Sequence, residues 1–200
     1  MKKISFKGIK FYSGNYYQIK KKFDNGGVLV APAASALANI EIDNLYYLSL
    51  KKSNIAILDS GFFCILLRLF KFQKVRKLSG FLFLKSFLDG YQNKDKILLI
   101  DPSRKSNKIN KIYLRSKKIY NFKSYIAPKY KRNITDKKLL IFIKNFKPKY
   151  IIMNIGGGTQ EPLAIYLRDK IKFKISIMCT GAAIAFMTGE QAPINKFIDK

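Results

Sequence analysis

The chain has 200 residues, 48% of them hydrophobic and 14% aromatic, which is enough to bury one domain core and too little for two ordinary ones. Thirty-nine lysines and arginines against 12 aspartates and glutamates give a formal net charge of +27, which attracts phosphates on nucleic acid, anionic lipid or nucleotide-sugar alike. Histidine is absent, which excludes His-dependent triads and the commonest zinc ligand, so acid–base chemistry falls to carboxylates, tyrosines or lysines.

Two further features of the composition bear on location. The charged start, Met1 to Gly8, lacks the apolar core of a signal peptide, so we expect a cytoplasmic protein. The apolar run from Ile55 to Phe70 is interrupted by Asp59 and Arg68 and is shorter than the ~20 residues of a membrane span, which favours a buried strand entering a buried helix. The lysine excess also fits a chain whose composition is set by AT-rich codons.

In chain order, the first predicted unit is a strand at 28–30 followed by a small-residue helix at 33–40. The second is a strand at 55–58, broken at Asp59-Ser60-Gly61, followed by a helix at 62–72. A third strand at 97–100 ends in Asp101-Pro102-Ser103. The lysine-rich stretch after it keeps the apolar spacing of an amphipathic helix at Ile109, Ile112 and Tyr113.

The second half continues the alternation. A helix is predicted at 135–146, where Pro148 stops it, and an apolar strand at 150–155 enters a glycine loop and a helix that reaches about Lys170. A last strand at 175–178 precedes a small-residue helix or turn at 181–187. This rhythm predicts an α/β fold in one domain, 1–200, with a Rossmann-like, mostly parallel sheet and helices on both faces.

Ligands bind such sheets beyond the carboxyl ends of the strands. The distinctive clusters of this sequence all follow predicted strands: 31–35, 59–61, 101–103, 156–161 and 180–182. Within the glycine cluster, Gly156, Gly157 and Gly158 precede Thr159, and their backbone N–H groups are candidates to hold a diphosphate at a helix start. The spacing matches neither a dinucleotide fingerprint nor a P-loop, so a tight turn is the alternative.

Single residues also suggest chemistry. Gln160 and Glu161 follow flexible glycines, a position suited to hydrogen bonding with a ligand. Asp59 ends an apolar strand, where it is a candidate general base or, alternatively, an N-cap for the next helix. Arg76 and Lys77 are candidates to neutralise a leaving diphosphate without a metal, or else form a solvated basic turn.

Together these residues resemble the WecG/TagA/CpsF family of glycosyltransferases (glycosyltransferase family 26), from about Val28 to the end of the chain. The most specific stretch is 151–163, which looks like the family's strand, glycine loop and Gln-Glu pair. The resemblance implies inverting transfer of N-acetylmannosamine or a related sugar from a UDP donor to a polyprenyl-diphosphate-linked acceptor in cell-surface polysaccharide synthesis. It further implies a peripheral protein at the anionic inner face of the plasma membrane.

The resemblance also assigns roles. Gln160 takes the place of the family's donor-site glutamine, and Asp59 that of the aspartate that deprotonates the acceptor hydroxyl. Lys77 stands where the family has a diphosphate-binding arginine, and Gly181 opens a closing motif that resembles the family's through Ala192-Pro193. Ser35, Gly156, Gly157, Gly158, Thr159 and Glu161 complete the substrate-binding residues that we expect; no metal or cofactor is expected.

Four departures from the family pattern are visible. Ala31-Pro32-Ala33 replaces its Thr-x-Asn, Ser60 is inserted into its Asp-Gly, and Ala185 replaces an aspartate of the closing motif. The family's basic, amphipathic carboxyl-terminal appendage is expected to be absent beyond Lys200.

Two other functions remain open. A catalytically inactive membrane-surface scaffold of the same fold would bind anionic vesicles and turn over nothing. A nucleic-acid-binding protein, suggested by aromatic residues among the lysines of Tyr120 to Arg132, would show a salt-steep affinity for DNA or RNA; we expect no nucleic-acid partner.

Overall fold

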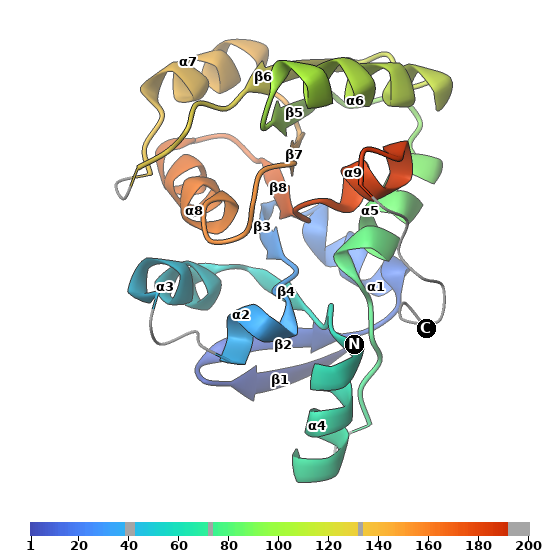
Figure 1. Cartoon of the computed structure of the whole chain (residues 1–200), viewed down its shortest axis with the longest axis vertical. Helices are drawn as coiled ribbons and strands as arrows, with labels where there is room; N and C mark the ends of the chain where they lie inside the picture. Colours follow the sequence, from blue (N-terminus) through green and yellow to red (C-terminus); the bar gives the residue numbers. More distant parts are fainter. Residues whose placement is uncertain (39–42, 72–73, 132–133, 192–200) are drawn as a thin grey trace.

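The computed structural model describes residues 1–38, 43–71, 74–131 and 134–191. Within these residues, eight strands form one sheet in the order β1-β2-β4-β3-β8-β7-β5-β6 (Figure 1). The strands are β1 (Lys2–Phe6), β2 (Ile9–Ser13), β3 (Gly27–Val30), β4 (Ile55–Ile57), β5 (Ile97–Asp101), β6 (Phe122–Ile126), β7 (Tyr150–Met153) and β8 (Ser176–Cys179).

The centre of the sheet is parallel, as predicted. The strands β4, β3, β8, β7 and β5 pair parallel with their neighbours, and almost every residue in them is buried. Continuous apolar runs such as Ile97 to Ile100 suit this position, because a strand covered on both faces needs no polar side. The predicted α/β fold with a mostly parallel sheet is confirmed.

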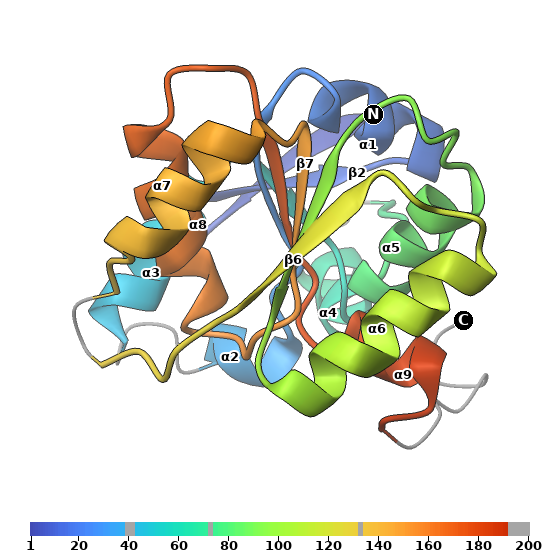
Figure 2. The same ribbon diagram turned by 90° about the horizontal axis from the view of Figure 1, so that it is seen from above.

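Helices cover both faces of the sheet (Figure 2). On one side lie α3 (Asn44–Lys52), α7 (Lys137–Phe146) and α8 (Gln160–Lys170), and on the other α1 (Tyr16–Phe23), α5 (Gly80–Asp89), α6 (Arg104–Ser116) and α9 (Ala183–Thr188). The short α2 (Ala34–Ala38) and α4 (Gly61–Lys71) lie near the β1–β2 end. Two apolar clusters, one on each face, make up the core.

Several elements were missing from the sequence prediction. The hairpin of β1 and β2 adds an antiparallel edge, and its alternation of buried Ile9 and Phe11 with exposed Lys10 is the period-two signal that the lysine-rich start obscured. The outer strand β6 is only partly buried, and Lys123 and Ser124 interrupt its apolar residues, so it lacks the continuous apolar run of the central strands. Helices α1, α3 and α5 were also missed, although each begins at an N-cap side chain: Asn15, Asp43 and Ser79.

Boundaries shift by a few residues elsewhere. The helix expected at 135–146 begins at Lys137, because the Asp136 side chain accepts from the N–H of Leu139 as its N-cap. The strand expected at 150–155 ends at Met153, and the helix expected from 181 begins at Ala183. Parts of two predicted helices, 39–40 and Phe72, lie outside the described residues, as does Ala192-Pro193.

Candidate functional site

Two adjoining cavities open at the carboxyl ends of the central strands. The first has a volume of about 440 Å³ and contains Lys77, Ser79 and Phe81; the second has a volume of about 550 Å³ and contains the glycine loop. Both are lined by a common set of residues: Ala33, Asp59, Thr180, Ala182 and Phe186. The edge of the sheet that the sequence indicated therefore carries one composite hollow.

Asp59 lies on the wall between the two cavities. Its Oδ1 accepts a hydrogen bond of 2.6 Å from the N–H of Gly80, the first residue of α5. The N-cap of the helix that follows Asp59 is instead served by Ser60, whose Oγ accepts from the N–H of Phe63. Asp59 is thus not the cap of its own helix but is oriented by the N-terminus of another one, half-buried and lining both cavities.

Lys77 reaches the first cavity from the segment that leads into α5. The N–H of the next residue, Leu78, donates to the carbonyl of Leu58 at 3.1 Å, which ties this segment to the end of β4. The Lys77 stem lies 3.8 Å from the position that a Cβ on Gly61 would occupy. The lysine cation and the positive end of the α5 dipole consequently line the same hollow, an arrangement that favours an anion.

Gln160 and Glu161 join the loops that follow β7 and β8. The Glu161 carboxylate accepts from the N–H of Gly158 at 2.8 Å and from the Gln160 side-chain amide at 2.9 Å. The side-chain Oε1 of Gln160 in turn accepts from the N–H of Gly181 at 3.1 Å. Both side chains are buried, so this relay fixes the shape of the second cavity from within.

Burial raises the pKa of Glu161 to about 7, because desolvation penalises the charged carboxylate more than its hydrogen bonds favour it. The nearby carboxylate of Asp43 makes a smaller contribution to the same shift. Asp43, Asp59 and Glu161 all line the second cavity, together with Tyr46. A wall with three carboxylates suits the hydroxyl groups of a sugar better than a phosphate.

The four glycines around this relay differ in what holds them. Gly158 and Gly181 have φ of +80° and +58°, a backbone conformation that glycine adopts readily because it has no Cβ. At Gly156 and Gly157, by contrast, φ is not positive and a Cβ would meet no atom within 4 Å. Space at these two positions is open to solvent and to a ligand.

The loop does not present all of its N–H groups outward. Gly158 donates to Glu161, and Thr159 and Gln160 both donate to the carbonyl of Gly156. A diphosphate held by these three N–H groups would have to displace internal bonds. The first cavity, with Lys77, is therefore the better place for negative charge.

Seven of the ten predicted site residues line the two cavities: Asp59, Lys77, Gly157, Gly158, Gln160, Glu161 and Gly181. Ser35 is exposed on α2, and neither it nor Gly156 nor Thr159 lines either cavity. Among the departures from the family pattern, Ala31 and Ala33 form part of the walls, whereas Ala185 does not.

Some polar residues of the hollow had no role assigned from the sequence: Asp43, Tyr46 and Ser79 were not singled out, and Thr180 was named only within the cluster 180–182. Asp43 and Tyr46 belong to α3, whose start is signalled by an aspartate N-cap before an apolar repeat. Thr180 follows β8, and its buried Oγ1 has no hydrogen-bond partner among the residues that the structure describes. An unsatisfied buried hydroxyl is uncommon, and this one lines both cavities.

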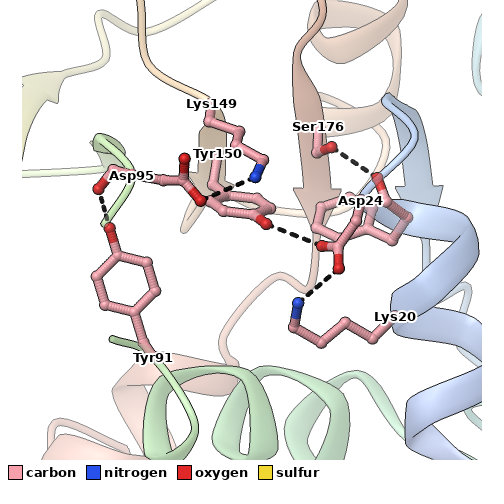
Figure 3. Close-up of polar contacts among 8 residues, drawn as sticks. Lys20, Asp24, Tyr91, Asp95, Lys149, Tyr150 and Ser176 are labelled. Carbon is pink, nitrogen blue, oxygen red and sulfur yellow. Dashed lines mark hydrogen bonds and ion pairs between the residues drawn. The ribbon is translucent and has the colours of Figure 1, made fainter. Parts of the chain in front are cut away.

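A second polar cluster lies at the opposite ends of the strands (Figure 3). There, the hydroxyl of Tyr150 donates to Asp24 at 2.8 Å, Lys20 pairs with the other oxygen of Asp24, and Lys149 pairs with Asp95. Because these groups satisfy one another, the cluster joins α1 to the starts of β7 and β8. We read it as structural.

Another polar cluster surrounds Asp101 at the end of β5, a residue of the predicted cluster 101–103 whose asparagine partners the sequence did not indicate. This fully buried carboxylate accepts from the side-chain amides of Asn107, Asn110 and Asn154 at 2.7–2.8 Å. Burial raises its pKa, and the three amides oppose that shift. Asp101 lines neither cavity and anchors α6 and the β7 loop to the sheet.

The described residues offer neither a metal-binding cluster nor a membrane-spanning helix. They contain no group of three or more Cys, Asp or Glu side chains arranged to hold a metal ion. Among the helices of the described ranges, none is long and apolar enough to cross a membrane.

Comparison with known families decides what kind of protein carries this hollow. The model of the glycosyl transferase WecG/TagA/CpsF family matches residues 8–200, nearly the whole chain. The chain belongs to the WecG/TagA/CpsF glycosyltransferase family. A search of curated proteins returned no match.

Membership gives the composite hollow a general purpose. A WecG/TagA/CpsF glycosyltransferase has a sugar donor and an acceptor to accommodate. The hollow of this family member offers two adjoining cavities, the first lined by Lys77 and the second by Asp43 and Glu161, with Asp59 in the wall of both.

Proposed function

We propose that this protein is an inverting glycosyltransferase that moves an N-acetylmannosamine-type or related hexose from a UDP donor to a lipid-linked, polyprenyl-diphosphate acceptor. We place it at the inner face of the plasma membrane, in cell-surface polysaccharide synthesis. The observation that carries the proposal is the convergence of Asp59, Lys77 and the Gln160–Glu161 relay on one hollow.

In the proposed reaction, the acceptor hydroxyl oxygen attacks the anomeric carbon from the side opposite the UDP. The bond between that carbon and the diphosphate oxygen breaks, and its electron pair leaves with UDP. The acceptor proton passes to Asp59, which the N–H of Gly80 holds in place. Inversion at the anomeric carbon follows from this single displacement.

The charges of the two cavities suggest how the donor lies. The diphosphate belongs in the first cavity, where Lys77 and the α5 N-terminus neutralise the developing charge. Donor hydroxyls belong in the second cavity, where Asp43 accepts hydrogen bonds and the buried Glu161 shapes the wall. In this scheme the positive groups supply the charge that a metal provides in other transferases, and Gln160 positions the loops. The unpartnered Thr180 hydroxyl supports a polar ligand at their junction.

The first test is thermal-shift and calorimetric titration with UDP, with ADP as comparison. We expect selective stabilisation by UDP, because tight binding to the folded state raises Tm by mass action. The Lys77→Ala variant should bind UDP on the order of tenfold more weakly and bind uridine unchanged, because only the diphosphate contacts the lysine. Equal losses for UDP and uridine would contradict this assignment.

Asp59→Asn separates binding from chemistry. The asparagine carbonyl can still accept from Gly80, so UDP binding should be retained, while transfer to a lipid-diphosphate acceptor falls by about 10²- to 10⁴-fold. If UDP neither raises the Tm of the wild-type protein nor gives a calorimetric signal, the donor assignment is wrong. The inactive scaffold at the membrane surface then becomes the better reading.

A further inference from the structure

Helix α4 has apolar side chains on nearly all sides. Its sequence, Gly-Phe-Phe-Cys-Ile-Leu-Leu-Arg-Leu-Phe-Lys, contains no acidic residue. Phe63, Cys64 and Leu67 face inward and are buried. The opposite face is also apolar yet uncovered: exposed fractions are 64% at Phe62, 51% at Ile65, 63% at Leu69 and 77% at Phe70.

A helix that is apolar all round is ordinarily buried, in a protein core or in lipid. The helix α4 has 11 residues, so it is about 16 Å long and cannot span a hydrocarbon layer of about 30 Å. It projects from one end of the molecule (Figure 1). Nothing among the described residues covers this apolar face, and exposed apolar patches of this kind mark sites where a protein meets another protein or a membrane.

An apolar groove adds to this surface. Side chains of α4, β1 and α2 enclose about 310 Å³ with almost entirely apolar walls. Phe62 and Ala34 line both this groove and the first cavity of the candidate site. The uncovered surface is thus continuous with the hollow that contains Asp59.

Charge indicates what covers the surface. Between Ser60 and Arg76, in α4 and directly after it, the chain has four cations and no carboxylate: Arg68, Lys71, Lys74 and Arg76. The Arg68 guanidinium donates to the carbonyl of Val75 at 2.8 Å, which holds the cationic return segment against the helix. Apolar side chains flanked by cations match the boundary of an anionic bilayer, whereas two copies of a +27 chain repel each other.

We propose that α4 is the membrane-binding element of this protein: Ile65, Leu69 and Phe70 enter the acyl boundary of an anionic bilayer, and the adjacent cations bind its headgroups. This deepens the proposed function, because α4 begins two residues after Asp59 and its docking turns the mouth of the first cavity toward the lipid surface. A lipid-linked acceptor then reaches Asp59 without leaving the bilayer.

The absence of tryptophan provides a direct test. Leu69→Trp places a single indole on α4, and Ile141→Trp places one on α7 at a side chain that is 60% exposed. With phosphatidylcholine vesicles that contain phosphatidylglycerol, we expect a blue shift and quenching by brominated acyl chains at position 69 only. Equal responses at both positions, or none at 69, would overturn the proposal.

Vesicle flotation of charge variants provides the second readout. Leu69→Glu should lower the bound fraction on the order of tenfold, and Ile141→Glu, with the same change in net charge, should not. Circular dichroism checks that both fold. If Leu69→Glu instead converts a lipid-free dimer into a monomer, a second copy covers α4 and the proposal is wrong. The vesicle experiments contain no nucleotide or acceptor. A negative result in them therefore leaves the proposed UDP site untouched, and a negative UDP titration leaves the proposed membrane contact of α4 untouched.

Discussion

At the scale of single residues, Asp59 and Glu161 differ in burial and in hydrogen-bond partners, although both are carboxylates at the same edge of the sheet. Asp59 is half-buried and oriented by the N–H of Gly80, which suits a group that meets a substrate. Glu161 is buried and already accepts from Gly158 and Gln160, which suits a group that shapes the cavity. The sequence places both at the right edge of the sheet, but burial and partners separate their tasks.

Glu161 should make stability depend on pH. The pKa of Glu161 is raised from 4.5 to about 7 on folding. Its contribution to the free energy of unfolding is therefore fully present below pH 4.5 and is lost as pH rises through about 7, because the buried carboxyl must then ionise. The loss is at most on the order of 3 kcal/mol. Denaturant unfolding of wild type and Glu161→Gln from pH 4.5 to 8.5 measures it. The two free energies of unfolding should diverge across this range, and parallel curves would show that Glu161 does not titrate as proposed.

At the scale of elements, the glycine loop combines positions that the fold requires with positions that it leaves open. Gly158 has a φ of +80°, and its N–H holds Glu161. Gly157 has neither constraint, and its absent side chain leaves room in the second cavity. The sequence cannot distinguish the three consecutive glycines, because only the backbone conformation shows which one has a positive φ and which one leaves open space.

A pair of alanine variants tests this distinction. Gly158→Ala should destabilise the protein by about 1–2 kcal/mol, because an L-residue is strained at positive φ. Gly157→Ala should leave Tm unchanged or slightly higher, since it reduces the freedom of the unfolded chain without a clash. It should nevertheless weaken UDP-sugar binding on the order of tenfold if the donor occupies this space. Calorimetry of both variants gives the two quantities, and unimpaired binding by Gly157→Ala would place the donor elsewhere.

At the scale of the whole molecule, the two ends of the strands have different uses. The carboxyl ends carry cavities, a buried hydroxyl without a partner and a carboxylate of raised pKa. The amino ends carry the cluster of Figure 3, in which Tyr150, Asp24 and Lys20 satisfy one another. The carboxyl ends therefore carry the groups that we propose for ligand binding, whereas the amino ends carry hydrogen bonds and an ion pair between parts of the fold.

Removing one hydroxyl from the structural edge should affect stability alone. Tyr150→Phe loses the bond to Asp24 and should cost about 0.5–1.5 kcal/mol, or a few degrees of Tm. Tyr120→Phe, at an exposed tyrosine, is the matched control and should change neither the free energy of unfolding nor Tm. The UDP-induced shift in Tm should be the same in all three proteins, and a smaller shift in Tyr150→Phe would couple the two edges.

The sequence alone was sufficient for the parallel centre of the sheet, the edge at which the two cavities open and the family, because long apolar strands and glycine or aspartate breaks are local patterns. It was insufficient for the antiparallel hairpin and for α5, whose N-terminus orients Asp59 across 21 positions of the chain. Likewise, no local pattern joins Gln160 to Gly181 or leaves one face of α4 uncovered. Such features depend on which distant segments pack together, and packing is settled by the fold as a whole.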